Sequence, residues 1–134
     1  MTTSTAEQEG GDPVIGPGAE LPPWPLAVTP TVVISTALAT RDFQDVHHDR
    51  DAAVRRGSRD IFLNILTTTG LVQRYVTDWA GPETVVRGIE IRLGAPCHPG
   101  DTLTFTGRAR PGEVTVTGRT GSGEHVSGTV RLAS

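Results

Sequence analysis

Apolar positions between residues 60 and 79 form the longest continuous pattern in the chain. They recur mostly at three- and four-residue spacings, as one face of a helix requires: Phe62, Ile65, Leu66, Leu71, Val72, Tyr75, Val76 and Trp79. Asp60 is placed to begin the helix, where an anion is favourable, and Gly81-Pro82 ends it. The pattern predicts a long buried helix over residues 60–79, in which Gly70 allows close approach to a sheet.

After Pro82 the pattern changes to a period of two. Residues 84–96 alternate apolar with charged positions, which predicts a half-buried strand. Residues 101–112, 113–123 and 124–134 have the same character, and turns that contain Gly or Pro separate them. Four antiparallel strands are therefore predicted after the helix.

The chain before the helix divides into three stretches. Residues 1–22 carry almost no large apolar side chains, which predicts a disordered tail and leaves residues 23–134 as a single domain. The stretch LPPWPLAVTP, residues 21–30, is rich in proline and is expected to be extended or turned. Residues 31–40, TVVISTALAT, open with β-branched side chains and predict a strand.

A single long helix must bury its apolar face against another element. A curved antiparallel sheet wrapped around the helix is the economical solution, and it predicts an α+β protein with a hot-dog fold. Such a wrap leaves one sheet edge and one flank of the helix uncovered, so we expect two such units to associate.

Composition and charge exclude several classes of function. The 134 residues carry a formal net charge of -3, with scattered arginines and no run of like charge, so neither nucleic acid nor a membrane surface is an expected partner. Cys97 is the only cysteine, which excludes a disulfide within the chain. The first residues lack the apolar run of a signal peptide or membrane span, so we expect a cytoplasmic protein.

Residues 40–53, TRDFQDVHHDRDAA, concentrate four aspartates and two adjacent histidines. One interpretation is a solvated turn that caps a following helix. A second is a metal site built from His47, His48, Asp45 and Asp49, although adjacent histidines point to opposite sides of an extended chain. A third is general acid-base chemistry, in which Asp42 and His47 converge on one water. The spacing alone leaves all three open.

The stretch DFQDVH, residues 42–47, with Ala53 six positions further on, resembles the motif of the MaoC-like enoyl-CoA hydratases, also called hydratase 2. That motif runs aspartate, any residue, asparagine, proline, an aliphatic residue, histidine and then a small residue. The stretches ILTTTGL and IEIRLGAPCHPGDTLTFTGRA are similar to the family's central helix and its strand-turn-strand. The resemblance covers about residues 28–110, implies the hot-dog fold, and selects His47 rather than His48.

The resemblance implies that Asp42 and His47 are catalytic and hydrate a 2-enoyl-CoA thioester to the 3-hydroxyacyl-CoA. It places the backbone N–H of Ile65 near the thioester oxygen, and Asn64 in the pocket or bonded to the neighbouring loop. It implies no metal or other cofactor, because CoA is part of the substrate. The chain departs from the family pattern in three places: Arg41 replaces a glycine, Gln44-Asp45 replaces asparagine-proline, and Asn64-Ile65 replaces histidine-glycine.

Residues 37–53 and 57–82 are also similar to the small catalytic subunits of actinobacterial heteromeric hydratases that act on steroid side-chain acyl-CoA, in cholesterol-type catabolism. This narrower resemblance implies an acyl-CoA substrate and a larger MaoC-like subunit in a heterotetramer-type assembly. It also implies a thiolase-like aldolase linked to that partner. Two other functions stay open: a catalytically idle hot-dog subunit that stabilises a partner, and an acyl-CoA thioesterase.

Overall fold

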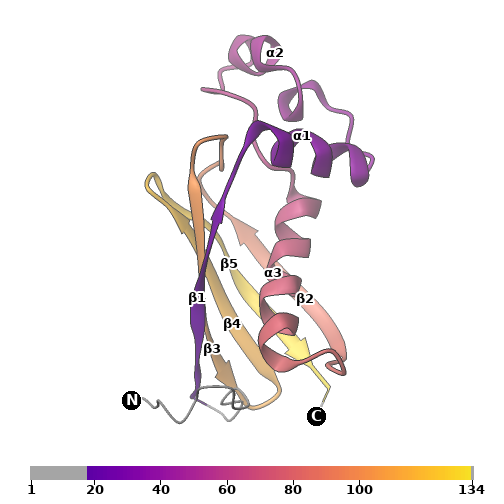
Figure 1. Ribbon diagram of the computed structural model, residues 1–134, viewed down its shortest axis with the longest axis vertical. Helices are drawn as coiled ribbons and strands as arrows, with labels where there is room; N and C mark the ends of the chain where they lie inside the picture. Colours follow the sequence, from indigo (N-terminus) through magenta and orange to yellow (C-terminus); the bar gives the residue numbers. More distant parts are fainter. Residues whose placement is uncertain (1–17, 134) are drawn as a thin grey trace.

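The computed structural model describes residues 18–133, which form five strands, three α-helices and one short 3-10 helix. In chain order these are β1 (Glu20–Ala27), α1 (Pro30–Ala39), the 3-10 helix η2 (Asp45–His47), α2 (Arg50–Arg55), α3 (Ile65–Ala80), β2 (Val86–Leu93), β3 (Thr102–Arg110), β4 (Glu113–Thr120) and β5 (Gly123–Leu132). Figure 1 shows α1 and α2 at one end of the molecule, above the start of α3.

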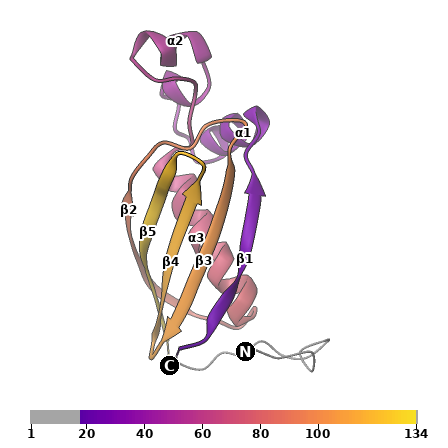
Figure 2. The same cartoon turned by 90° about the vertical axis from the view of Figure 1, so that its left-hand side faces the viewer.

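The strands form one antiparallel sheet in the order β1-β3-β4-β5-β2. They lie side by side in Figure 2, with α3 behind them. The four strands predicted after the helix are confirmed, and the proline-rich stretch is extended as expected, as β1. Pro22 and Pro23 fall where the pairing of β1 with β3 shifts register, which suits residues without a backbone N–H on an edge strand.

The core lies between α3 and the sheet. Buried apolar side chains of α3 pack against buried residues of the strands. The α3 residues are Val72, Tyr75, Val76 and Trp79. The strand residues are Leu21, Leu103, Phe105, Ala109, Val114, Val116, Val126 and Val130. This single helix on one antiparallel sheet is the predicted α+β hot-dog fold.

Residues 31–39 are helical, so the strand predicted over residues 31–40 is wrong. Thr29 caps α1 by accepting a hydrogen bond from the N–H of Val32 at 3.1 Å, and Pro30 takes the first helical position. Val33 and Ala37, four residues apart, are fully buried on one face. Because β-branching lowers helix propensity only slightly, the cap and this burial decide the conformation.

The long helix begins at Ile65 rather than at Asp60, so its predicted start is also wrong. Asn64 is the N-cap, and its side-chain oxygen accepts from the N–H of Thr67 at 3.0 Å. Residues 60–64 are not helical and lie between two neighbouring segments. Gly70 is exposed, and a Cβ there would meet only open space, so it does not provide the predicted close approach to the sheet.

The predicted tail can be compared with the structure only at its end. Residues 1–17 lie outside the described residues, whereas Glu20 to Pro22 already belong to β1, so the predicted boundary at residue 22 is too late. Among residues 18–133, no helix is long and apolar enough to cross a membrane.

Candidate active site

Asp42 is placed by the way α1 ends. The N–H of Arg41 donates to the carbonyl of Leu38 at 3.0 Å, and the N–H of Asp42 donates to the carbonyl of Ala37 at 2.9 Å. These two bonds, with the φ of 58° at Arg41, form a Schellman motif. The left-handed position of this motif favours glycine, so the geometry explains the glycine that the hydratase 2 motif carries where this chain has Arg41.

The chain still forms a hydrogen-bonded turn between Asp42 and His47, although Gln44-Asp45 replaces asparagine-proline. Asp42 Oδ1 accepts from the N–H of Gln44 at 3.4 Å, and η2 follows at once. Arg56 donates from Nε to Oδ1 and from Nη2 to Oδ2 of Asp45, at 2.9 and 3.2 Å. These bonds hold the pKa of Asp45 below its ordinary value. The substituted turn is thereby tied to the end of α2.

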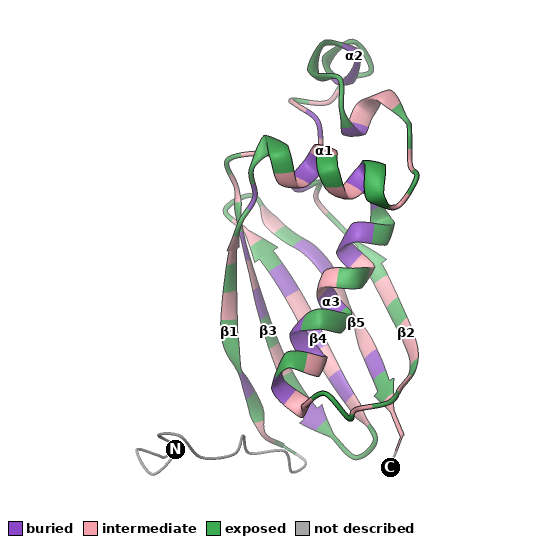
Figure 3. Ribbon diagram, turned by 45° about the vertical axis from the view of Figure 1, so that its right-hand side comes forward, coloured by how far each residue is buried: buried purple, intermediate pink, exposed green. Residues whose placement is uncertain are grey.

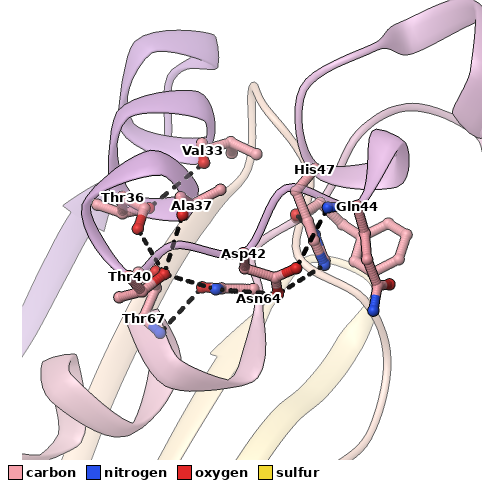
Figure 4. A network of polar contacts seen from close by, with 10 residues as sticks. Val33, Thr36, Ala37, Thr40, Asp42, Gln44, His47, Asn64 and Thr67 are labelled. Atoms are coloured by element: carbon pink, nitrogen blue, oxygen red, sulfur yellow. Dashed lines mark hydrogen bonds and ion pairs between the residues drawn. The ribbon is translucent and has the colours of Figure 1, made fainter.

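The turn brings Asp42 and His47 together, as Figure 4 shows. His47 Nε2 lies 3.4 Å from Asp42 Oδ2; the His47 side chain is 7% exposed and that of Asp42 is 21% exposed. His47 Nδ1 lies 2.7 Å from the carbonyl oxygen of Phe62. Because a carbonyl can only accept, Nδ1 carries the hydrogen, and in the neutral ring Nε2 presents its lone pair to the carboxylate. Two acceptors therefore face each other.

Asn64 holds the carboxylate in place. Its Nδ2 donates to Thr40 Oγ1 at 2.8 Å and to Asp42 Oδ2 at 3.2 Å, while its Oδ1 caps α3. With 2% exposure it has no free surface for a ligand. Of the two interpretations of Asn64, the structure therefore shows the polar group bonded to the neighbouring loop. It acts on the candidate site through Asp42.

Ile65 is the first residue of α3, where backbone N–H groups have no acceptor within the helix. Among the residues that the structure describes, no acceptor is bonded to the N–H of Ile65. The residue is 51% exposed. The group is free to donate to a ligand, and its contact with a thioester oxygen stays a prediction.

The remaining polar residues of the cluster have local roles. Asp49 Oδ1 accepts from the N–H of Ala52 at 3.1 Å and so caps α2, His48 is exposed, and Ala53 is fully buried. Within residues 18–133, no group of three or more His, Cys, Asp or Glu side chains is placed to hold a metal ion. The turn interpretation describes Asp45 and Asp49. Asp42 and His47 are in contact, as the acid-base interpretation requires, and their catalytic role stays a prediction.

Two contributors to the site could not be inferred from the sequence. The carbonyl of Phe62 fixes the hydrogen on His47, but every residue carries a carbonyl, so no residue type marks this role. Thr40 links Asn64 to α1 through its hydroxyl, which donates to the carbonyl of Thr36 at 2.8 Å. Cys97 takes no part: it is fully buried, and burial, with a smaller effect of Asp101, raises the pKa of its thiol to about 12.

Comparison with known proteins identifies the family to which this chain belongs. Residues 17–129 match the MaoC like domain, and the chain belongs to this family. It is 58% identical over 121 residues to the 3-oxo-4,17-pregnadiene-20-carboxyl-CoA hydratase beta subunit of Mycobacterium tuberculosis, covering 87% of this chain and 94% of that protein.

Solved structures agree with this family. A chain of the ChsH1-ChsH2 complex from Mycobacterium tuberculosis is similar with a TM-score of 0.85 and 56% identity, over 90% of this chain and 98% of that one. The R-hydratase PhaJ1 from Pseudomonas aeruginosa has a TM-score of 0.78 at 17% identity, over 87% of this chain and 79% of that one, and shows the shared fold.

Proposed function

We propose that this chain is the catalytic subunit of a heteromeric hydratase that adds water to a 2-enoyl-CoA thioester and gives the 3-hydroxyacyl-CoA. The observation that carries the proposal is the pair of acceptors, Asp42 Oδ2 and His47 Nε2, held 3.4 Å apart. One water that donates a hydrogen to each of them satisfies both. A water held in this way is oriented by a carboxylate and an imidazole, as general base catalysis requires.

The chemistry follows from this water. As its oxygen attacks the β-carbon of the enoyl group, Asp42 takes one of its protons, and His47 keeps hold of the second hydrogen. The pair then returns a proton to the α-carbon, so that a hydroxyl group and a hydrogen have been added across the double bond. Asn64 fixes the orientation of the carboxylate by its bond to Oδ2. Positioned proton transfer of this kind contributes about 10²–10⁴-fold to a rate.

Negative charge develops on the thioester oxygen during the attack. The N–H of Ile65, at the positive end of the 16-residue helix α3, is the donor that we assign to this oxygen. Loss of one such donor typically raises a barrier by ~3 kcal/mol. The thioester itself activates the double bond, and we therefore propose that the reaction uses neither a metal nor another cofactor.

We infer that the substrate carries a steroid side chain, since the relative at 58% identity is named for a pregnadiene carboxyl-CoA. Large apolar side chains border the site and are about half exposed or more: Leu38, Phe43, Ile65 and Leu66. Figure 3 colours the first residues of α3 as exposed. Such a surface needs covering by an apolar ligand or another subunit.

For the assembly we propose a larger MaoC-like subunit in a heterotetramer-type complex, supported by the ChsH1-ChsH2 complex, in which the similar chain was solved. A thiolase-like aldolase linked to that partner is proposed on the family resemblance alone. We place the assembly in the cytoplasm, where acyl-CoA thioesters are metabolised and where the free thiol of Cys97 stays reduced.

Co-expression with a larger MaoC-like subunit tests this proposal. The purified complex is sized and given steroid and straight-chain enoyl-CoAs, while enoyl-thioester absorbance and free CoA are followed together. We expect a heteromer that removes the absorbance of the steroid substrate faster and releases no CoA. A stable homodimer active on short enoyl-CoAs would contradict the heteromer. Release of free CoA would identify a thioesterase, and absence of both reactions would indicate an idle subunit.

A further inference from the structure

A second buried histidine lies on the other side of the segment that anchors His47. His98, 7% exposed, sits in the turn between β2 and β3, and its Nδ1 lies 2.9 Å from the carbonyl oxygen of Ile61. His47 makes the same contact with the next carbonyl along the chain, that of Phe62. Two consecutive carbonyls thus accept from two imidazoles, and the ring of Phe62 meets both edge-on, at centroid distances of 5.0 and 6.3 Å.

The hydrogen bonds of residues 61–63 alternate between the two sides. In the peptide unit between Ile61 and Phe62, the carbonyl faces His98 and the N–H donates to Val46 at 3.2 Å. In the next unit, the carbonyl of Phe62 faces His47, and the N–H of Leu63 donates to the carbonyl of Cys97 at 3.0 Å. Each peptide plane is therefore held at both ends, the first by His98 and Val46 and the second by His47 and Cys97.

The outer contact is itself firmly built. The backbone N–H of His98 donates to Asp101 Oδ2 at 2.9 Å, and the N–H of Asp101 donates back to the carbonyl of His98 at 3.1 Å. The N–H of Gly100 donates to the carbonyl of Val28 at 2.8 Å, which joins the turn to the end of β1. The backbone that carries the His98 imidazole is thus held in place.

We propose that His98 is a positioning residue for the hydration reaction, acting through the Ile61–Phe62 backbone on the tautomer of His47. The His98 imidazole holds the first peptide plane, and the carbonyl of its chain neighbour Cys97 holds the second. Together they keep the carbonyl of Phe62 on Nδ1 of His47, so that Nε2 stays an acceptor toward the water beside Asp42. The catalytic meaning of this inference rests on the proposed function, whereas the effect on the tautomer does not.

The matched pair His98→Asn and His98→Leu tests the inference. Both side chains branch at Cγ and have similar shapes, but only asparagine places an N–H donor where His98 has Nδ1. In the full-length chain, in the assembly in which it purifies, His98→Leu is expected to lower kcat about tenfold and to leave KM within about twofold. His98→Asn is expected to restore most of the rate. The control is His48→Leu, which changes an exposed histidine next to His47 in the sequence. It is expected to change neither kcat nor KM.

A direct readout without substrate is the ¹⁵N NMR spectrum of the four histidines, with His47 assigned by His47→Gln. The wild type is expected to show His47 with a protonated Nδ1 and a bare Nε2, and His98→Leu to show a mixture of tautomers. If His98→Leu does not fold, His98→Ser replaces it, because its short side chain also leaves the Ile61 carbonyl unpaired.

An unchanged tautomer and kcat in the folded variant would overturn the inference, as would a wild-type His47 protonated at Nε2 alone. A wild type with the expected tautomer but without hydratase activity would refute the proposed function and leave the positioning intact.

Discussion

His47 and His125 are both buried histidines, and the difference between their surroundings is the reason why we propose a catalytic role for the first and a structural role for the second. Each ring is anchored through Nδ1 to a backbone carbonyl, His47 to Phe62 at 2.7 Å and His125 to Ala95 at 2.8 Å. Their Nε2 atoms differ. That of His125 lies 2.8 Å from the hydroxyl of Thr68, which can donate to it and complete its bonding, whereas that of His47 faces the carboxylate of Asp42.

The two sites differ in what is left unsatisfied rather than in burial, since His125 is 3% and His47 is 6% exposed. Burial lowers the pKa of His125, and the hydrogen bond to Ala95 opposes this only partly. The neutral ring of His125 has a hydrogen-bond partner on each nitrogen, Ala95 and Thr68, and needs no further partner. The neutral ring of His47 faces a carboxylate that cannot donate to Nε2, and we propose that a water supplies this donor.

Replacing each histidine with glutamine should have opposite effects: one variant should lose activity and the other should lose stability. His47→Gln is expected to lower kcat by about 10²–10⁴-fold while the thermal unfolding of the assembly stays close to that of the wild type. His125→Gln is expected to cost about 1–3 kcal/mol in free energy of unfolding, because Thr68 and Ala95 lose their partner, and to leave kcat nearly unchanged. Denaturant titration and steady-state kinetics on both variants measure this, and equal effects on activity would refute the distinction.

Two variants separate the two roles of Asn64, which are the cap of α3 and the hydrogen bond to Asp42. Asn64→Ser keeps an oxygen that can cap α3 but removes the amide donor to Asp42, so we expect kcat to fall about tenfold with little loss of stability. Asn64→Ala removes both and should in addition cost about 1 kcal/mol in free energy of unfolding. If Asn64→Ser kept full activity, the orienting bond to Asp42 would be irrelevant to catalysis.

The pH dependence of stability should report on His125. Because burial lowers its folded-state pKa below the ordinary 6.5, the unfolded chain binds the proton more readily. The stabilisation from the neutral ring is fully present above pH 6.5 and is lost as the pH falls from there through the folded-state pKa. The wild type should therefore lose more free energy of unfolding below pH 6.5 than His125→Gln does. Parallel curves for the two proteins would show that His125 does not titrate differently in the fold.

The smallest expected effect concerns Arg41, which carries the left-handed conformation before Asp42. Arg41→Gly should raise the free energy of unfolding by up to about 1 kcal/mol, because glycine adopts positive φ without steric cost. Arg41→Ala, which keeps the Cβ, is the matched control and should give no such gain. Chemical denaturation of the two variants decides, and a gain shared by both would point to the arginine side chain instead of the backbone.

The sequence predicted the regular parts of this fold and missed those that depend on single contacts. The alternation in residues 84–132 predicts β2 to β5, because one face of each strand packs on α3. The sequence does not predict α1, because its β-branched residues favour a strand and Arg41 stands where a glycine would signal the end of a helix. The sequence places the start of α3 too early, because Ile61 and Leu63 are buried by neighbouring segments rather than on a helix.

For the candidate site, the motif register predicted which aspartate and which histidine meet, and the structure brings Asp42 and His47 together. Their support could not be predicted in the same way. The Phe62 carbonyl is backbone, and the bond from Asn64 to Asp42 joins residues 22 positions apart. Only the folded chain shows such contacts.

The measurement that tests the central claim most directly is single-turnover hydration by Asp42→Asn in the assembled protein. Asparagine has the same shape but can donate its own hydrogen to His47 Nε2, and so removes both the base and the need for a bridging water. We expect the enoyl-thioester absorbance to persist after substrate is added to a folded, fully assembled variant. Undiminished loss of that absorbance in this variant would contradict this expectation.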